Sequence, residues 1–205
     1  MRVKTEARRQ VILEVAGKLF LHHGFAAVSM AAVAAEVGGS RMTLYNYFPN
    51  KESLFEAFVV AAGIDVCDNL LDLPSPSAPL EIRLRVLAHN LLRLSLKPEI
   101  LAIHRLIIGE ALRAPGLSRI FYANGPGRTL NDLMSVITSA MDQEQLRQAD
   151  PQTCALHFKV LCEAGIVEQQ LWGLAHEPQS GSVNQAIDSA LEVFLSAYAP
   201  RASNS

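Results

Sequence analysis

The chain has 205 residues, half of them hydrophobic and 19% charged, so it can bury a substantial core as one large domain or two small ones. This composition excludes a chain that stays disordered for lack of apolar surface, and no apolar run approaches the roughly 18 residues that span a bilayer. The three cysteines form no C-x-x-C pair, which argues against a disulfide framework or a zinc site and favours a reducing, cytoplasmic setting.

The net charge of −2 conceals an asymmetry along the chain. Residues 1–50 carry six basic and three acidic side chains, whereas the remaining residues carry 12 basic and 17 acidic ones. A basic N-terminal end on an acidic body suggests that this end meets an anion.

Helical periodicity dominates from the start, without strand alternation or an internal repeat. Thr5 is a suitable N-cap for a first helix, and Gly24 is placed to end it. One face of this helix is expected to be buried, and it consists of Val11, Ile12, Val15, Ala16, Leu19 and Phe20.

Residues 28–47 predict two short helices joined by a tight turn, which is typical of a helix-turn-helix. Ser29 and Ser40 are the expected N-caps, and the turn between the helices contains Gly38 and Gly39. Pro49 ends the second short helix, because the residue before a proline is disfavoured in helical conformation. Asn50 then caps a long fourth helix whose inward side chains include Leu54, Phe55, Phe58 and Val59.

The proline- and serine-rich stretch 72–81 predicts a loop between two sections of the chain. Beyond it the periodicity predicts helices over 80–96, 99–113, 116–142 with a break at "NGPG", 151–175 and 182–198. Long helices with apolar faces and short connections form a bundle, so the predicted fold class is all-α.

The segment "SRMTLYNYFPNK" has an inward and an outward face when it is drawn as a helix. Leu44 and Phe48 share the inward face, and the other side chains point outward or to the edges. An outward arginine and asparagine can pair with guanine or adenine edges, methionine and tyrosine can contact thymine methyls, and hydroxyls can hold phosphates. Lys51, just past the proline, would add a phosphate contact.

Periodicity alone leaves a second interpretation of this segment open. Tyr45 and Tyr47 could half-bury their rings against the first and fourth helices, as amphipathic aromatic residues do in many helical proteins.

The stretch "FAAVSMAAVAAEVGGSRMTLYNYFPNKESLFEAFV" resembles the DNA-binding domain of the tetracycline-repressor (TetR) family of bacterial regulators. The resemblance implies a DNA-binding domain over residues 5–65 and a helical ligand-binding and dimerisation domain over residues 66–200. It further implies a homodimer that binds a palindromic operator on double-stranded DNA and is released by a small-molecule effector.

The resemblance also implies roles for individual residues. Base edges would be contacted by Arg41, Met42, Tyr45 and Asn46, and phosphates would be held by Ser29, Thr43, Tyr47 and Lys51. Two residues depart from the family pattern. Gly39 stands where valine is usual, and Met42 stands where a small residue or proline is common.

The later stretch "LIIGEALRAPGLSRIFYANGPGRTL" resembles the regulatory domain of the AefR-like repressors. Four aromatic side chains and one histidine are candidates for an effector pocket, and they are His104, Phe121, Tyr122, Phe158 and Trp172. The alternative is that each of these residues belongs to the core of the bundle.

The two C-terminal helices carry small residues beside larger apolar ones, which predicts a four-helix interface between two copies. The residues of this expected interface are Ala155, Leu161, Gly165, Ile166, Ala186, Ile187, Ala190, Leu191 and Phe194.

Two other classes of function are alternatives to a regulator. An enzyme would need a nucleophile–base pair, a carboxylate dyad, a phosphate loop or a metal motif, and the sequence has none of these patterns. We therefore expect no enzyme, no cofactor, no metal and no membrane partner. A scaffold that has lost DNA affinity is the second rival, and an activator is an alternative to a repressor.

Overall fold

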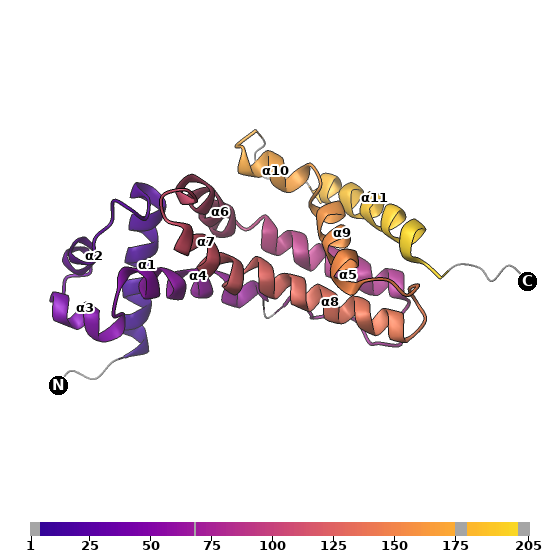
Figure 1. Ribbon diagram of the computed structural model, residues 1–205, viewed down its shortest axis with the longest axis horizontal. Helices are drawn as coiled ribbons and strands as arrows, with labels where there is room; N and C mark the ends of the chain where they lie inside the picture. Colours follow the sequence, from indigo (N-terminus) through magenta and orange to yellow (C-terminus); the bar gives the residue numbers. More distant parts are fainter. Residues whose placement is uncertain (1–4, 68, 175–179, 201–205) are drawn as a thin grey trace, which may run out of the picture. The chain divides into compact units, whose positions relative to one another are not determined.

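The computed structural model describes residues 5–67, 69–174 and 180–200, and this part of the chain is helical throughout (Figure 1). None of the described helices combines the length and apolar character that a membrane span needs. The helices are α1 (Glu6–His23), α2 (Met30–Glu36), α3 (Arg41–Tyr47), α4 (Lys51–Cys67), α5 (Leu80–Ser95), α6 (Pro98–Glu110), α7 (Pro115–Asn124), α8 (Pro126–Asp142), α9 (Pro151–Glu163), α10 (Ile166–Leu171) and α11 (Ser180–Tyr198).

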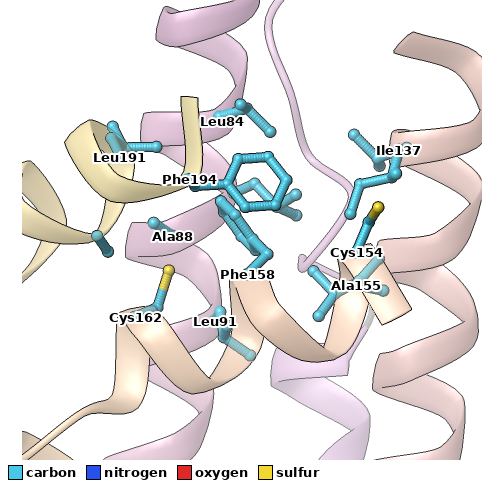
Figure 2. Packing of buried hydrophobic residues seen from close by; sticks show 14 of the residues in the cluster. Leu84, Ala88, Leu91, Ile137, Cys154, Ala155, Phe158, Cys162, Leu191 and Phe194 are labelled. Carbon is cyan, nitrogen blue, oxygen red and sulfur yellow. The ribbon is translucent and has the colours of Figure 1, made fainter. Parts of the chain in front are cut away.

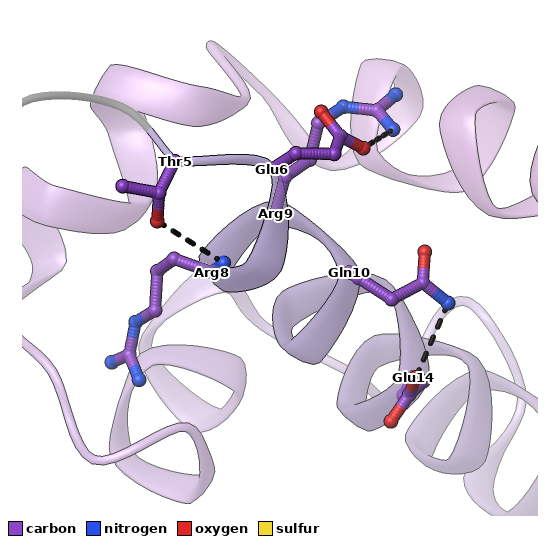
Figure 3. Close-up of polar contacts among 6 residues, drawn as sticks. All are labelled: Thr5, Glu6, Arg8, Arg9, Gln10 and Glu14. Carbon is purple, nitrogen blue, oxygen red and sulfur yellow. Dashed lines mark hydrogen bonds and ion pairs between the residues drawn. The ribbon is translucent and has the colours of Figure 1, made fainter.

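The predicted N-caps of the first four helices are confirmed by their hydrogen bonds. The Thr5 hydroxyl accepts from the Arg8 amide at 3.3 Å, as Figure 3 shows, and the Asn50 carboxamide oxygen accepts from the Ser53 amide at 2.7 Å. Ser29 and Ser40 cap α2 and α3 in the same way. These bonds satisfy amides that have no partner inside their own helix, so each helix begins at its cap.

The expected helix over 151–175 is wrong in one respect, because it is divided into α9 and α10. Gly165 adopts a φ of +74°, a conformation that interrupts the α-helix and that glycine reaches without a steric penalty. The apolar pattern continues across this break, so periodicity alone did not reveal it.

By packing, the described chain divides into two compact units. The first unit comprises residues 1–64 and 102–126, and the second comprises residues 65–101 and 127–205. The predicted division at residue 65 stays a prediction about domains, but α6 from Ala102 onward and all of α7 pack with the N-terminal helices.

The core of the first unit is built around three phenylalanine rings. Phe20, Phe25 and Phe55 lie with ring centroids 5.4–5.6 Å apart. The same cluster includes apolar side chains of α6 and α7, namely Ile103, Ile107, Leu117 and Phe121.

The predicted buried face of α1 is shifted by one residue. The structure buries Ile12, Leu13, Ala16, Gly17 and Phe20 and leaves Val11 exposed. The shift follows from Gly17, which has no side chain and therefore allows the Phe58 ring to lie against the backbone of α1. A β-carbon at this position would be 2.4 Å from Cε2 of Phe58.

The core of the second unit joins α5, α8, α9 and α11, and Figure 2 shows its centre. Phe158 and Phe194 meet edge to face, with ring centroids 5.2 Å apart. Cys162 lies in the same cluster, and its burial raises the pKa of the thiol to about 12. This thiol stays protonated at neutral pH, so it packs as an apolar group.

This core corrects the predicted interface between two copies. Ile187, Leu191 and Phe194 are buried inside their own subunit, as are Ala155 and Ala190. These five residues belong to the subunit's own core and are not available to a second copy. Leu161, Ile166 and Ala186 are half-buried and Gly165 is exposed, so their role in an interface stays a prediction.

We predict that Gly17→Ala destabilises the protein by about 1–3 kcal/mol, because the new methyl group must displace the Phe58 ring. In a Phe58→Leu background the same change should stabilise by up to about 1 kcal/mol, since alanine favours a helix over glycine. Urea unfolding of the four proteins measures both effects. An equal effect in the two backgrounds would contradict the packing of Phe58 on Gly17.

Candidate DNA-binding surface

Helix α3 presents the outward face that the sequence predicts. Leu44 and Phe48 are buried, whereas Arg41 and Asn46 are exposed on the same short segment. Met42 is 71% exposed and Tyr45 is 47% exposed, which is unusual for large apolar or aromatic side chains. The structure therefore brings a cation, an amide and two large side chains together on one accessible helix face.

The hydroxyl groups around α2 and α3 are engaged in caps and still keep bonding capacity. The Ser29 hydroxyl accepts from the Ala32 amide at 3.1 Å, and the Ser40 hydroxyl accepts from the Thr43 amide at 3.1 Å. The Ser40 and Thr43 hydroxyls are 2.9 Å apart and bond to each other. A capping hydroxyl accepts with one lone pair and keeps its own hydrogen, which it can donate to a phosphate oxygen. In the Ser40–Thr43 pair, one of the two hydrogens is already used in the bond between the hydroxyls.

Tyr47 links the end of α3 to the start of α1. Its hydroxyl accepts a hydrogen bond from the Thr5 amide at 2.9 Å, and its ring is half-buried. The predicted alternative of a half-buried ring therefore holds for Tyr47, while its hydroxyl hydrogen remains able to donate.

The sequence predicts that Lys51 contacts a phosphate, but in the structure its ammonium group bonds to backbone carbonyls. Nζ donates at 2.8 Å to the carbonyl oxygens of Phe25 and Val28, and it lies 3.5 Å from the carbonyl oxygen of Ala26. It also lies 4.2 Å from the centroid of the Phe25 ring. An ammonium group has three N–H donors, and these contacts hold the loop that leads into α2.

Arg8 contributes to the position of the turn before α3, a role that the sequence did not predict. Its Nη2 donates to the carbonyl oxygens of Val37 and Gly38, at 3.2 and 3.4 Å, and so joins α1 to the turn between α2 and α3. The sequence signal that could have revealed it is Gly39, a turn position with no side chain to pack.

The five candidate pocket residues occupy different surroundings. His104 and Phe121 belong to the first unit and meet edge to face, with ring centroids 4.7 Å apart. Tyr122 of the same unit is exposed. In the second unit Phe158 is part of the core and Trp172 is exposed. The assignment of these residues to an effector pocket stays a prediction.

The described part of the chain contains no cluster of side chains that could bind a metal ion. No group of three or more histidine, cysteine, aspartate or glutamate side chains is placed there to hold an ion.

Two family models match separate parts of the chain. Residues 82–200 match the C-terminal domain of AefR-like transcriptional repressors, and residues 12–58 match the N-terminal domain of bacterial regulatory proteins of the tetR family. The AefR-like match alone covers more than half of the chain.

The chain is also similar to solved structures and to a curated protein. The chain is 35% identical to the flavonoid-responsive regulator FrrA, with a TM-score of 0.83, over 97% of this chain and all of FrrA. It is 25% identical to a TetR-family regulator from Mesorhizobium loti, with a TM-score of 0.82, over 97% of this chain and all of that one. A shorter match, 39% identical over 54 residues, covers 26% of this chain and 27% of the nucleoid occlusion factor SlmA from Pasteurella multocida. The chain therefore belongs to the TetR family of bacterial transcriptional regulators.

Proposed function

We propose that this protein is a ligand-responsive transcriptional repressor that binds a palindromic operator as a homodimer and is released by a small molecule. The observation that carries the proposal is the outward face of α3, where Arg41, Met42, Tyr45 and Asn46 stand exposed on a capped helix-turn-helix. A helix of this kind fits the major groove, which displays a distinct pattern of donors and acceptors for each base pair.

The exposed face divides into base-reading and phosphate-holding groups. Arg41 and Asn46 carry the donors and acceptors that pair with guanine and adenine edges, and Met42 and Tyr45 supply apolar surface for thymine methyls. Phosphates would be held by the hydroxyls of Ser29, Thr43 and Tyr47.

Lys51 serves the same surface indirectly in this proposal. Its ammonium group is bonded to the carbonyls of the loop before α2. It therefore keeps Ser29 and the N-terminus of α2 in place, and a phosphate would have to compete with those carbonyls for its donors.

A homodimer is required because one short helix reads only a few base pairs. Its interface would use the exposed aliphatic side chains of α9 and α11, namely Leu156, Val160 and Val193. These project from the two helices whose other faces form the subunit's own core, so a second copy could cover them with the same helices.

The response to an effector would pass through α6. The Oε1 atom of Glu110, a buried residue at the end of α6, accepts a hydrogen bond from the Ala26 amide at 3.4 Å. From α7, the Asn124 side chain donates to the Glu56 carboxylate of α4 at 3.2 Å. A ligand that prefers a shifted position of α6 would therefore disturb the loop before α2, by no more than its difference in affinity for the two states.

The effector proposed for first trial is a flavonoid. FrrA is a flavonoid-responsive regulator and shares 35% identity with this chain over nearly its whole length. Likeness of this extent makes an aromatic, polyhydroxylated ligand the best-supported chemical class.

We predict that selection from random duplex DNA with the purified protein enriches a palindrome with two half-sites. Arg41→Ala should relax the base preference at one position of each half-site, at a cost of about 1–3 kcal/mol in operator binding. Lys18→Ala is the matched control, because it removes an exposed cation from α1 without changing α3. Selection of the same sequences by wild type and Arg41→Ala would show that Arg41 does not read bases.

We predict that light scattering gives a dimer for the wild type and a monomer for Val160→Asp at micromolar concentration. The charge would be buried without a partner in the dimer, whereas in the monomer it would face water. The control is Ile108→Asp on α6, because Ile108 is 66% exposed and Val160 is 61% exposed. A monomeric wild type, or a dimeric Val160→Asp, would overturn the proposed interface.

We predict that a flavonoid weakens operator binding in a gel-shift titration by about 5- to 150-fold, the usual range for coupling between two sites. Operator binding that persists at saturating flavonoid would reject this effector class and leave the DNA-binding proposal standing.

A further inference from the structure

The turn between α2 and α3 contains two glycines whose backbone conformation and surroundings differ. Gly38 has a φ of +69°, and no atom lies within 4 Å of the place where its β-carbon would be, so its backbone conformation accounts for it. Gly39 has no such conformation. A β-carbon there would lie 2.9 Å from Nη2 of Arg8, so any side chain at position 39 would make the guanidinium group at the end of this flexible side chain move.

Arg8 fills that space and bonds the end of α2. Val37 is the C-cap of α2, and the last carbonyls of a helix have no partner inside it. The Arg8 guanidinium donates to the Val37 and Gly38 oxygens and places a positive charge at the negative end of the helix dipole. In Figure 3 the side chain of Arg8 leaves α1 on the side opposite to Arg9, which pairs with Glu6.

Beneath the turn the packing is incomplete. A partly open pocket of about 10 Å³ lies among α1, α2 and α3, and its lining includes Arg8, Ile12, Ala34, Gly39 and Leu44. This volume is about that of one water-sized probe, so it is too small for an effector. An apolar side chain at position 39 could fill this space, but Gly39 has none. The N-terminal end of α3 is therefore joined to α1 through the bonds of the Arg8 guanidinium group to the turn.

We propose that Arg8 and Gly39 form an interdependent pair that sets the position of α3 for DNA reading. Arg8 is thus a positioning residue that acts through the turn, and it need not touch DNA. This inference rests on the proposed function, since its effect is on operator binding. The alternative role for Arg8 is a direct phosphate contact, and the two roles predict different results.

The test is a double-mutant cycle on the operator obtained by selection with the wild type. Arg8→Ala and Gly39→Val should each weaken operator binding about tenfold, because the first removes the guanidinium group and the second displaces it. The double variant should recover to within about threefold of the wild type, since the valine side chain can occupy the vacated space and the pocket. Lys18→Ala controls for the loss of one positive charge from α1 and should bind like the wild type.

The salt dependence of binding separates the two roles of Arg8. In the positioning role, the slope of log affinity against log salt concentration is the same for Arg8→Ala and the wild type. A lost phosphate contact lowers the slope by about 0.9 and gives a double variant no tighter than Arg8→Ala. Either of those two results overturns the proposal.

A second readout needs no DNA and therefore distinguishes failure of this inference from failure of the proposed function. Hydrogen exchange at the amides of residues 38–43 should speed up in Arg8→Ala and return toward the wild-type rate in the double variant. Should Arg8→Ala not fold, Gly39→Ala replaces it, because its β-carbon also displaces the guanidinium group. Unchanged exchange in the single variants would overturn the positioning role, whatever the protein binds.

Discussion

A helix of seven residues is not stable by itself in water, and α3, the proposed DNA-reading helix of this protein, has that length. The rest of the first unit supplies what the short helix lacks. Ser40 caps its first turn, Leu44 and Phe48 bury its inner side, and Tyr47 ties its last turn to the start of α1. These contacts use the inner face and the two ends of α3. The exposed side chains of its outer face are therefore not needed for folding and can differ according to the DNA sequence to be bound.

Some cations near the helix-turn-helix bond to the protein's own backbone, and others are exposed to solvent. Lys51 and Arg8 donate to backbone carbonyls of the loop before α2 and of the turn after it. Arg41 stands exposed at the start of α3. A residue that looks like a phosphate ligand in the sequence can thus contribute to binding through the geometry of the backbone it holds.

Packing also joins α6 and α7 to the N-terminal helices more closely than chain order suggests. The apolar side chains of α6 and α7 share a core with Phe20 and Phe55, and Glu110 bonds the loop before α2. A displacement of α6 therefore meets a close-packed cluster and not a flexible linker, and such clusters transmit strain because they contain little free volume.

The sequence by itself determined the helical class, the four N-caps, the turn, the outward face of α3 and the break before α8, because each depends on atoms a few residues apart. Only the tertiary structure decided that Phe58 lies on Gly17, that Ala155 and Ala190 are buried in the subunit's own core, and where Lys51 and Arg8 bond. The partners of those two cations lie 23–30 residues away along the chain. Such contacts depend on how helices pack, and a long flexible side chain carries no local signal of which carbonyl it will reach.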